Sequence, residues 1–219
     1  NLLPLEEGER ITAFLPVREY SEEQFVFMAT SSGTVKKCPL NAFSRPRTAG
    51  LIALELLADD ELVGVEITHG GSDIMLFASG GKAGRFNESV VRSMGRTARG
   101  VKGMRLEPGE RIISLLVPEK HYILTATENG FGKRTPLEEY PCKGRGGKGV
   151  FSIQTSARNG AVIGAVQVND EEEIMMISDG GVLVRTRVAE ISVSSRNTQG
   201  VTLIRLSSGE KVVGIERVE

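Results

Sequence analysis

Glycine-rich runs that contain a lysine are the residues of this chain whose spacing first suggests chemistry. Gly80-Gly81-Lys82 and Gly146-Gly147-Lys148-Gly149 place bare backbone amides beside an amine, a combination that suits phosphate groups. Neither run fits the G-x-x-x-x-G-K-[ST] pattern that precedes a helix in nucleotide-binding loops. We therefore do not expect either run to bind a nucleotide.

The side chains that usually carry catalysis are few and scattered. His69 and His121 are 52 residues apart, and we interpret both as residues of surface turns or strand ends. Cys38 and Cys142 form no CxxC pair, so we interpret them as reduced cytosolic thiols and expect no zinc site. The acidic run 170–173 is interpreted as a solvated turn. Tyr20, Tyr122 and Tyr140 fall in strand or crossover positions. We expect no catalytic centre, metal or cofactor in this segment.

The overall charge of the chain argues at first against a nucleic-acid partner. The 219 residues carry 27 Lys and Arg against 28 Asp and Glu, a net charge of −1, whereas nucleic-acid-binding domains are usually basic. A hydrophobic content of 40% fits a globular chain, and no apolar run approaches the roughly 18 residues of a membrane helix. We expect a cytoplasmic protein. The start at Asn1, without Met or a signal peptide, suggests a processed chain or a fragment.

An internal repeat of about fifty residues is the strongest pattern in the sequence. Anchor glycines at 33, 81, 130 and 181 are 48, 49 and 51 residues apart. A second glycine series at 50, 100, 149 and 200 has spacings of 50, 49 and 51. A fixed period of this length is typical of repeat architectures such as propellers and solenoids. The period therefore sets the fold class before any single element does.

Each repeat has the same order of elements. An apolar strand such as 73–78 leads through a glycine turn into a second strand, a short crossover segment follows, and a basic loop ends at the second glycine. That glycine opens a strand such as 101–106, and a long alternating strand such as 62–65 completes the unit. Four strands per unit predict an all-β chain, a β-pinwheel or β-propeller-like array of four-stranded blades. We treat 1–219 as one domain with repeats at about 10–60, 61–109, 110–159 and 160–219, preceded by a remnant of an earlier blade at 1–9.

The repeat also sorts the charges. Windows from the anchor glycine to the second glycine or just beyond it (33–50, 81–103, 130–149 and 181–200) carry +4, +5, +3 and +2, or +14 in all, and the rest of the chain carries −15. Equivalent positions of a radial array share one surface, so this pattern predicts a basic rim suited to a long polyanion such as DNA. The candidate DNA-binding residues are Lys36, Lys37, Arg45, Arg47, Lys82, Arg85, Arg92, Arg96, Arg99, Lys102, Lys133, Arg134, Lys143, Arg145, Lys148, Arg185, Arg187 and Arg196.

The repeats and one loop together resemble a known family. The loop comprises Lys143, Gly144, Arg145, Gly146, Gly147, Lys148 and Gly149. It is similar to the GyrA box, the Gln-Arg-Arg-Gly-Gly-Lys-Gly heptapeptide in the C-terminal domain of DNA gyrase A, and five of the seven positions match. The resemblance covers the whole chain, including stretches such as 132–135, 164–168 and 196–200.

This resemblance implies a function. In the family a six-bladed β-pinwheel, whose strands reach into the adjacent blade, wraps duplex DNA around its rim. The wrap supports ATP-dependent negative supercoiling by bacterial gyrase, an A2B2 assembly of gyrase A and gyrase B. ATP and Mg²⁺ are used by other parts of that enzyme. The family's box lies in the first blade and begins with Gln-Arg, where this chain has Lys143-Gly144. We therefore expect the true box upstream of Asn1 and a phosphate-binding variant of it at 143–149.

Other functions compete with this interpretation. The equivalent domain of topoisomerase IV, which decatenates DNA, is the nearest alternative. A propeller-like protein-interaction module without a DNA role is a second, although the Gly-His and Trp-Asp signatures of WD repeats are missing. A propeller hydrolase is disfavoured, because no His/Asp/Glu cluster recurs in the repeats.

Overall fold

The computed structural model describes residue 5 and residues 7–218, so most of the expected remnant at 1–9 lies outside the described residues. The strands and short 3-10 helices recur in a fixed order. Each repeat begins with a hairpin of two strands: β1 (Phe25–Thr30) and β2 (Thr34–Pro39), β4 (Asp73–Ala78) and β5 (Lys82–Asn87), β8 (Tyr122–Thr127) and β9 (Phe131–Pro136), β12 (Glu173–Ser178) and β13 (Leu183–Arg187).

A 3-10 helix and a basic loop follow each hairpin. The helices are η1 (Leu40–Phe43), η2 (Glu88–Val90), η3 (Leu137–Glu139) and η4 (Val188–Glu190). After the second glycine, three repeats form a two-residue strand: β6 (Val101–Lys102), β10 (Val150–Phe151) and β14 (Val201–Thr202). Each repeat ends in a longer strand: β3 (Leu62–Thr68), β7 (Ile112–Leu116), β11 (Val162–Val168) and β15 (Val212–Val218).

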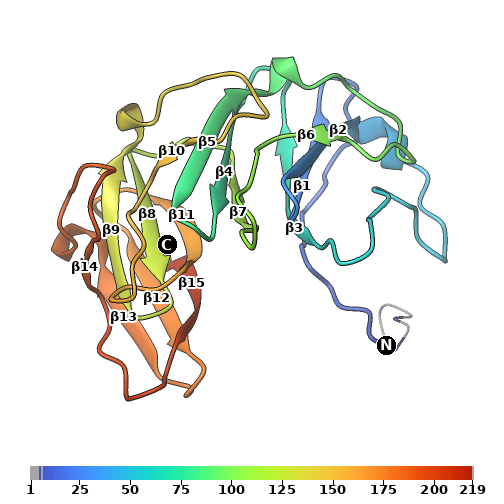
Figure 1. Cartoon of the computed structure of the whole chain (residues 1–219). Helices are drawn as coiled ribbons and strands as arrows, with labels where there is room; N and C mark the ends of the chain where they lie inside the picture. Colours follow the sequence, from blue (N-terminus) through green and yellow to red (C-terminus); the bar gives the residue numbers. More distant parts are fainter. Residues whose placement is uncertain (1–4, 6, 219) are drawn as a thin grey trace.

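The strands form four antiparallel sheets, which we call blades 1 to 4 and which follow one another along an arc (Figure 1). Their strand orders are β3-β1-β2-β6, β10-β5-β4-β7, β11-β8-β9-β14 and β13-β12-β15. The expected all-β array of blades is confirmed. Among the described residues the fourth sheet has three strands rather than four, because the fourth strand of each blade comes from the following repeat.

This exchange of strands joins the repeats. Strand β6 pairs with β2, with Val101 opposite Val35 and Lys102 opposite Thr34, so repeat 2 completes blade 1. The expected strand 101–106 is therefore wrong in length, and the chain leaves the sheet after Lys102 for a specific reason. The amides of Gly103 and Met104 both donate to the carbonyl oxygen of the anchor glycine, Gly33. The same pair of bonds recurs at the carbonyl oxygens of Gly81 and Gly130.

The anchor glycine must be glycine for two reasons. At Gly81, φ is +95°, a region that side chains with a Cβ disfavour. A Cβ there would also lie 2.2 Å from the carbonyl oxygen of Ile153, which belongs to the next repeat. The anchor glycine thus forms the turn and also contacts the neighbouring repeat, and both roles require a residue without a Cβ.

Among the described residues, three buried apolar clusters lie between adjacent sheets, and a fourth, around Val26 and Met28, lies within blade 1. Phe27 of blade 1 packs with Phe86 of blade 2, their ring centroids 6.4 Å apart. Met75 of blade 2 shares a buried cluster with Ile123 of blade 3, and a third cluster joins blades 3 and 4. A single small sheet cannot bury both of its faces, so each blade depends on its neighbours for a core.

Candidate nucleic-acid interface

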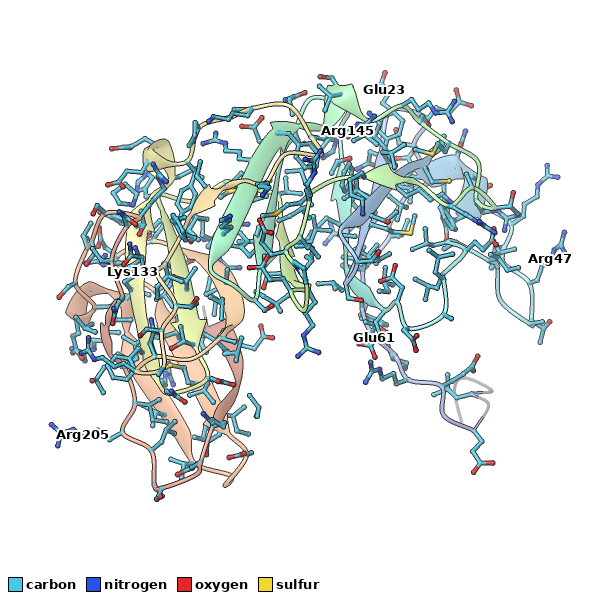
Figure 2. The ribbon with its side chains drawn as sticks, viewed as in Figure 1. Glu23, Arg47, Glu61, Lys133, Arg145 and Arg205 are labelled. Carbon is cyan, nitrogen blue, oxygen red and sulfur yellow. The ribbon has the colours of Figure 1, made fainter. Side chains whose placement is uncertain are left out.

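The basic loops lie on the outside of the arc. The long strands β3, β7, β11 and β15 contact one another in succession, which places them on the inner side of the array. The second strands and the exchanged strands therefore form the outer edges, and the basic loops connect them. In Figure 2, Arg47, Arg145 and Arg205 lie on the convex side of the arc, and Glu61 lies on the concave side.

Ten of the eighteen candidate cations are exposed, and they differ in whether they are paired. Arg99 binds Glu55 at 2.8 Å, Lys148 binds Glu107 at 2.9 Å, and both Arg185 and Arg187 face Glu173. The rest are Arg45, Arg47, Arg92, Lys102, Lys143 and Arg145. Within residue 5 and residues 7–218, the side chains of Arg45, Arg47, Arg92 and Lys143 have neither a hydrogen bond nor an ion pair. These four are free to meet an anion.

A second group of cations binds the next repeat instead of facing solvent. These residues stand four positions after the anchor glycine. Lys37 donates to the carbonyl oxygen of Glu88 at 3.0 Å, and Arg85 donates to those of Leu137 and Tyr140 at 3.2 and 3.1 Å. Arg134 does the same to the Ile191 carbonyl oxygen at 2.6 Å and also pairs with Asp170. Each of these three cations holds the crossover segment of the following repeat.

Two candidate lysines are fully buried, which corrects their assignment to an exposed rim. Lys36 and Lys133 both have 0% exposure. The Lys36 ammonium donates to the carbonyl oxygens of Ala53, at 2.7 Å, and Arg96. The Lys133 ammonium donates to those of Arg196, at 2.6 Å, and Ser195. Buried ammonium groups need such partners, so these lysines fasten the basic loops from beneath. With Lys37 and Arg134, also buried, they leave the exposed set.

Three arginines link one basic loop to the loop before it. Each stands four residues before the second glycine of its repeat. Arg96 donates to the Ile52 carbonyl oxygen at 3.1 Å, Arg145 to that of Lys102 at 3.0 Å, and Arg196 to that of Phe151 at 3.0 Å. Every acceptor is two residues after the preceding second glycine. The loops therefore form a continuous belt along the convex side rather than four separate patches.

The box-like loop 143–149 is attached to the belt by backbone hydrogen bonds. The Lys143 amide donates to the Arg85 carbonyl oxygen at 2.8 Å, and the Gly146 amide donates to that of Gly103 at 2.6 Å. The Gly147 carbonyl oxygen accepts from the Arg105 amide at 2.9 Å. Gly146 and Gly149 have φ of +77° and +75°, so this path of the backbone requires glycine at both positions.

Some exposed cations lie outside the sequence windows and were missed. Arg105 and Arg205 are exposed and both stand five residues after a second glycine; Arg205 lies on the convex side in Figure 2. Their recurrence at this spacing was the available signal. Lys82, Arg85, Arg96 and Arg196 are half-buried, and Lys82 sits over the ring of Phe151 at 5.6 Å.

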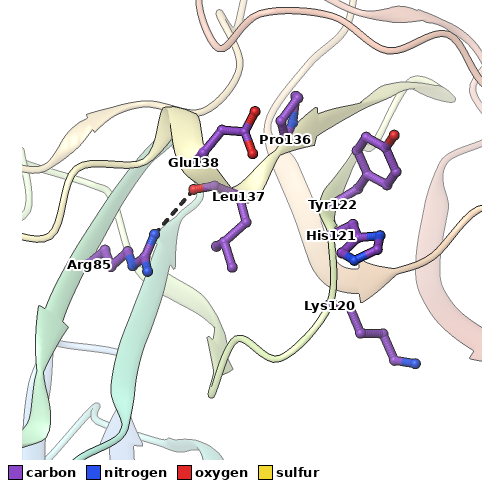
Figure 3. A pocket seen from close by; sticks show the side chains of 7 residues that line it. All are labelled: Arg85, Lys120, His121, Tyr122, Pro136, Leu137 and Glu138. Atoms are coloured by element: carbon purple, nitrogen blue, oxygen red, sulfur yellow. Dashed lines mark hydrogen bonds between the residues drawn. The ribbon is translucent and has the colours of Figure 1, made fainter.

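A surface hollow formed by described residues of repeats 2 and 3 brings several charged side chains together. This hollow, shown in Figure 3 and of about 450 Å³, is lined by Lys120, His121, Tyr122, Glu138 and Arg85, among others. Lys120 pairs with Glu172 and Arg85 with Asp73.

Across the described residues no three His, Cys, Asp or Glu side chains could together hold a metal ion. Cys38 is buried and Cys142 exposed, and both are free thiols. No helix in the described part of the chain is long and apolar enough to span a membrane.

Comparison with known proteins places the chain in a family. The model of the DNA gyrase C-terminal domain, beta-propeller, matches residues 24–69, 72–119, 121–169 and 172–219. DNA gyrase A of Salmonella typhimurium is 59% identical over all 219 residues, and that of Escherichia coli is 58% identical. The chain spans a quarter of the length of both relatives.

Solved structures agree with this match. The DNA gyrase A C-terminal domain aligns with a TM-score of 0.87 at 26% identity, over 99% of this chain and 73% of that one. The C-terminal domain of DNA topoisomerase IV aligns with a TM-score of 0.92 at 27% identity, over 99% and 68%. The resemblance drawn from loop 143–149 and the repeats is confirmed: the chain belongs to the family of DNA gyrase A C-terminal domains.

Proposed function

We propose that this chain binds duplex DNA without sequence preference along the convex belt and bends it. The observation that carries the proposal is the linkage of successive basic loops by Arg96, Arg145 and Arg196 into one surface. A continuous curved cationic surface suits a polyanion with one charge per ~1.7 Å of axis. Glycine-rich loops add backbone amides that contact phosphates and read no bases.

Bending duplex DNA by 40–90° over 20–30 base pairs costs on the order of 1–6 kcal/mol. One blade with one or two free cations cannot offset that cost alone. Contacts spread over several blades can, provided that the blades keep a fixed spacing. The links between neighbouring loops provide that spacing, so attachment of the loops and DNA bending belong to one mechanism.

In the intact protein the bent DNA would serve negative supercoiling. We propose that the chain works as part of a full-length gyrase A, paired with gyrase B in an A2B2 enzyme, in the bacterial cytoplasm and close to the nucleoid. ATP and Mg²⁺ would be used elsewhere in that assembly. The gyrase A relatives, identical at 58–59% of positions, support this role.

A direct test removes free cations from the belt. In the full-length protein, Arg47→Gln, Arg92→Gln and Lys143→Gln together should weaken duplex binding. The slope of log K against log salt should fall by about 2.7, because each lost phosphate contact contributes about 0.9. Arg111→Gln is the matched control: Arg111 is exposed and occupies the repeat position of Glu61, on the concave side. Equal effects of the belt variant and the control would refute the belt as the DNA surface.

The close structural match to the topoisomerase IV domain supports a second candidate, a decatenating enzyme. Assembled with gyrase B and ATP, the full-length protein should introduce negative supercoils into relaxed plasmid. Relaxation and decatenation without added supercoils would favour the topoisomerase IV role. Absence of duplex binding at any salt concentration would favour a protein-interaction module.

A further inference from the structure

Blade 2 differs from its neighbours at one repeat position. Three residues after the anchor glycine, blades 1 and 3 have the fully buried lysines Lys36 and Lys133. Both ammonium groups donate to carbonyl oxygens of the basic loop above them. Blade 2 has Gly84 at this position. The space that a lysine occupies beneath the loop in the neighbouring blades thus has no side chain of its own in blade 2.

A hollow of about 190 Å³ lies at this place, beneath the box-like loop. Its lining includes Gly84, Lys143, Gly144, Gly147, Lys148 and Gly149. A Cβ built on Gly84 would approach only the Met104 side chain, at 3.6 Å, which is an ordinary contact. The volume is several times the ~30 Å³ that one water molecule occupies. It therefore admits a small polyatomic group together with water.

The lining favours an anion with several oxygen atoms. Lys143 is exposed and has no side-chain partner among the described residues, and Lys148 shares only an exposed ion pair with Glu107, which is a weak interaction. Arg85 is already neutralised by Asp73 at 2.8 Å. The glycines expose backbone without side-chain cover, and peptide N–H groups beside ammonium groups are a recurrent phosphate environment.

We propose that this hollow binds one phosphate group and that the DNA backbone supplies it when the duplex follows the belt. The inference rests on the proposed function and makes it more specific. Lys36 and Lys133 fill the equivalent spaces, so phosphates pass outside blades 1 and 3. Blade 2 then holds the duplex at one defined point, while the exposed cations of the other loops attract it along the rest of the path.

Gly84→Lys in the full-length protein tests the proposal, because the proposal and a simple charge effect predict opposite changes in the affinity for duplex DNA. The variant fills the hollow with the residue of the neighbouring blades and adds one positive charge. A rim that acts only through net charge would bind duplex DNA more tightly. Our proposal predicts binding about 10-fold weaker at fixed salt, with the log K against log salt slope smaller by about 0.9 for the lost phosphate. Unchanged or tighter binding by Gly84→Lys overturns the proposal.

Val184→Lys is the matched control, because Val184 holds the same repeat position in blade 4 and is half-buried at an open sheet edge. It adds the same charge without filling the hollow, so its duplex affinity should equal or exceed that of the wild type. Amide hydrogen exchange of both variants shows whether the blades remain folded. Should Gly84→Lys fail to fold, Lys143→Gln with Lys148→Gln takes its place. An unchanged salt slope in that double variant would overturn the proposal.

Titration with inorganic phosphate distinguishes binding of free phosphate from binding of a phosphate group in the DNA backbone. Titrated into the wild-type protein, inorganic phosphate should shift the NMR amide signals of Gly144, Gly147 and Lys148, and Gly84→Lys should abolish the shifts. Lack of shifts in the wild type overturns the hollow as a phosphate site. Shifts in a wild-type protein that binds no duplex would retain the site and refute the proposed DNA function, so the two failures are distinguishable.

Discussion

Replacement of Lys133 by Met should change how the stability of this protein depends on pH. Burial lowers the pKa of Lys133 from 10.5 to about 8, with Glu139 raising it and Arg196 lowering it further. The side chain has 0% exposure, and its ammonium is held by two loop carbonyl oxygens. Methionine keeps much of the side-chain volume and removes the titrating group.

The magnitude follows from the pKa difference. One pKa unit corresponds to 1.36 kcal/mol, so protonated Lys133 costs the folded state about 3 kcal/mol relative to the neutral form. Because the folded pKa is the lower one, the unfolded chain binds more protons between pH 8 and 10.5. The free energy of unfolding must therefore rise with pH across that window. Below pH 8 both states are protonated and this contribution is constant.

Urea denaturation of wild type and Lys133→Met at pH 7, 8, 9 and 10 measures this effect. The stability difference should shift towards the wild type by an amount on the order of 2–3 kcal/mol between pH 7 and pH 10. Lys102→Met is the control: Lys102 is exposed, so its loss should not alter the pH dependence. Parallel curves for wild type and Lys133→Met would refute the reasoning that a charged lysine lies buried beneath the loop.

Three further predictions concern the turns of the repeats and the joints between them. Gly81→Ala should lower the free energy of unfolding by more than about 2 kcal/mol, because its Cβ is strained at a φ of +95° and also clashes with the Ile153 carbonyl oxygen. Gly109→Ala is at φ +81° with no atom within 4 Å, so it should lower the free energy of unfolding only by the backbone strain. Asp60→Asn should reduce the loss of stability on acidification. Burial alone raises the pKa of Asp60, but hydrogen bonds from Ser32, Thr30 and Ser31 bring it to about 2. The stabilising charge is therefore lost as pH falls from about 4 to 2, which urea titrations at pH 2–5 will show. Arg196→Gln should speed amide hydrogen exchange in 195–202 and weaken duplex binding, whereas Arg187→Gln, which removes a guanidinium that faces Glu173 of its own blade, should leave the exchange unchanged.

The fold was predictable because the sequence repeats its local rules four times. The anchor glycines turn as expected, with φ of +83°, +95°, +84° and +81° at Gly33, Gly81, Gly130 and Gly181. What could not be predicted was the length of the exchanged strands. The strand that begins at Val101 was expected to extend to residue 106, but the chain leaves the sheet after Lys102 because the Gly33 carbonyl oxygen binds the next two amides. That acceptor is 70 residues earlier in the sequence, and no local pattern reveals it.

The candidate interface was predicted less well, for a different physical reason. The sequence shows which residues are positively charged, but not which hydrogen-bond acceptor each lysine or arginine contacts. Lys36 and Arg47 lie in the same basic window, yet the first is buried against loop carbonyl oxygens and the second is exposed. A backbone carbonyl oxygen can accept from an ammonium group, as a phosphate oxygen does, and every residue has a carbonyl. Charge sorting along the repeat therefore identifies the surface but not the individual contacts.

Recurrence itself separates the two kinds of cation, in the direction opposite to the one first expected. A cation that recurs at one position of the repeat has a role that the repeats share. Contact with the following repeat is such a role, because each repeat except the last has a following repeat within the chain. Lys37, Arg85 and Arg134 recur, and all three bind the next repeat. A duplex that lies across the belt needs positive charge at the surface but no particular repeat position. Those cations are free to vary. Of the eighteen predicted cations, the four that are unpaired among the described residues, Arg45, Arg47, Arg92 and Lys143, share no position with a cation of another repeat. Arg105 and Arg205, outside the predicted set, are the exception, because they recur and are exposed. Substituting recurrent cations should thus disturb the array first and DNA binding second, whereas substituting these four should affect DNA binding alone.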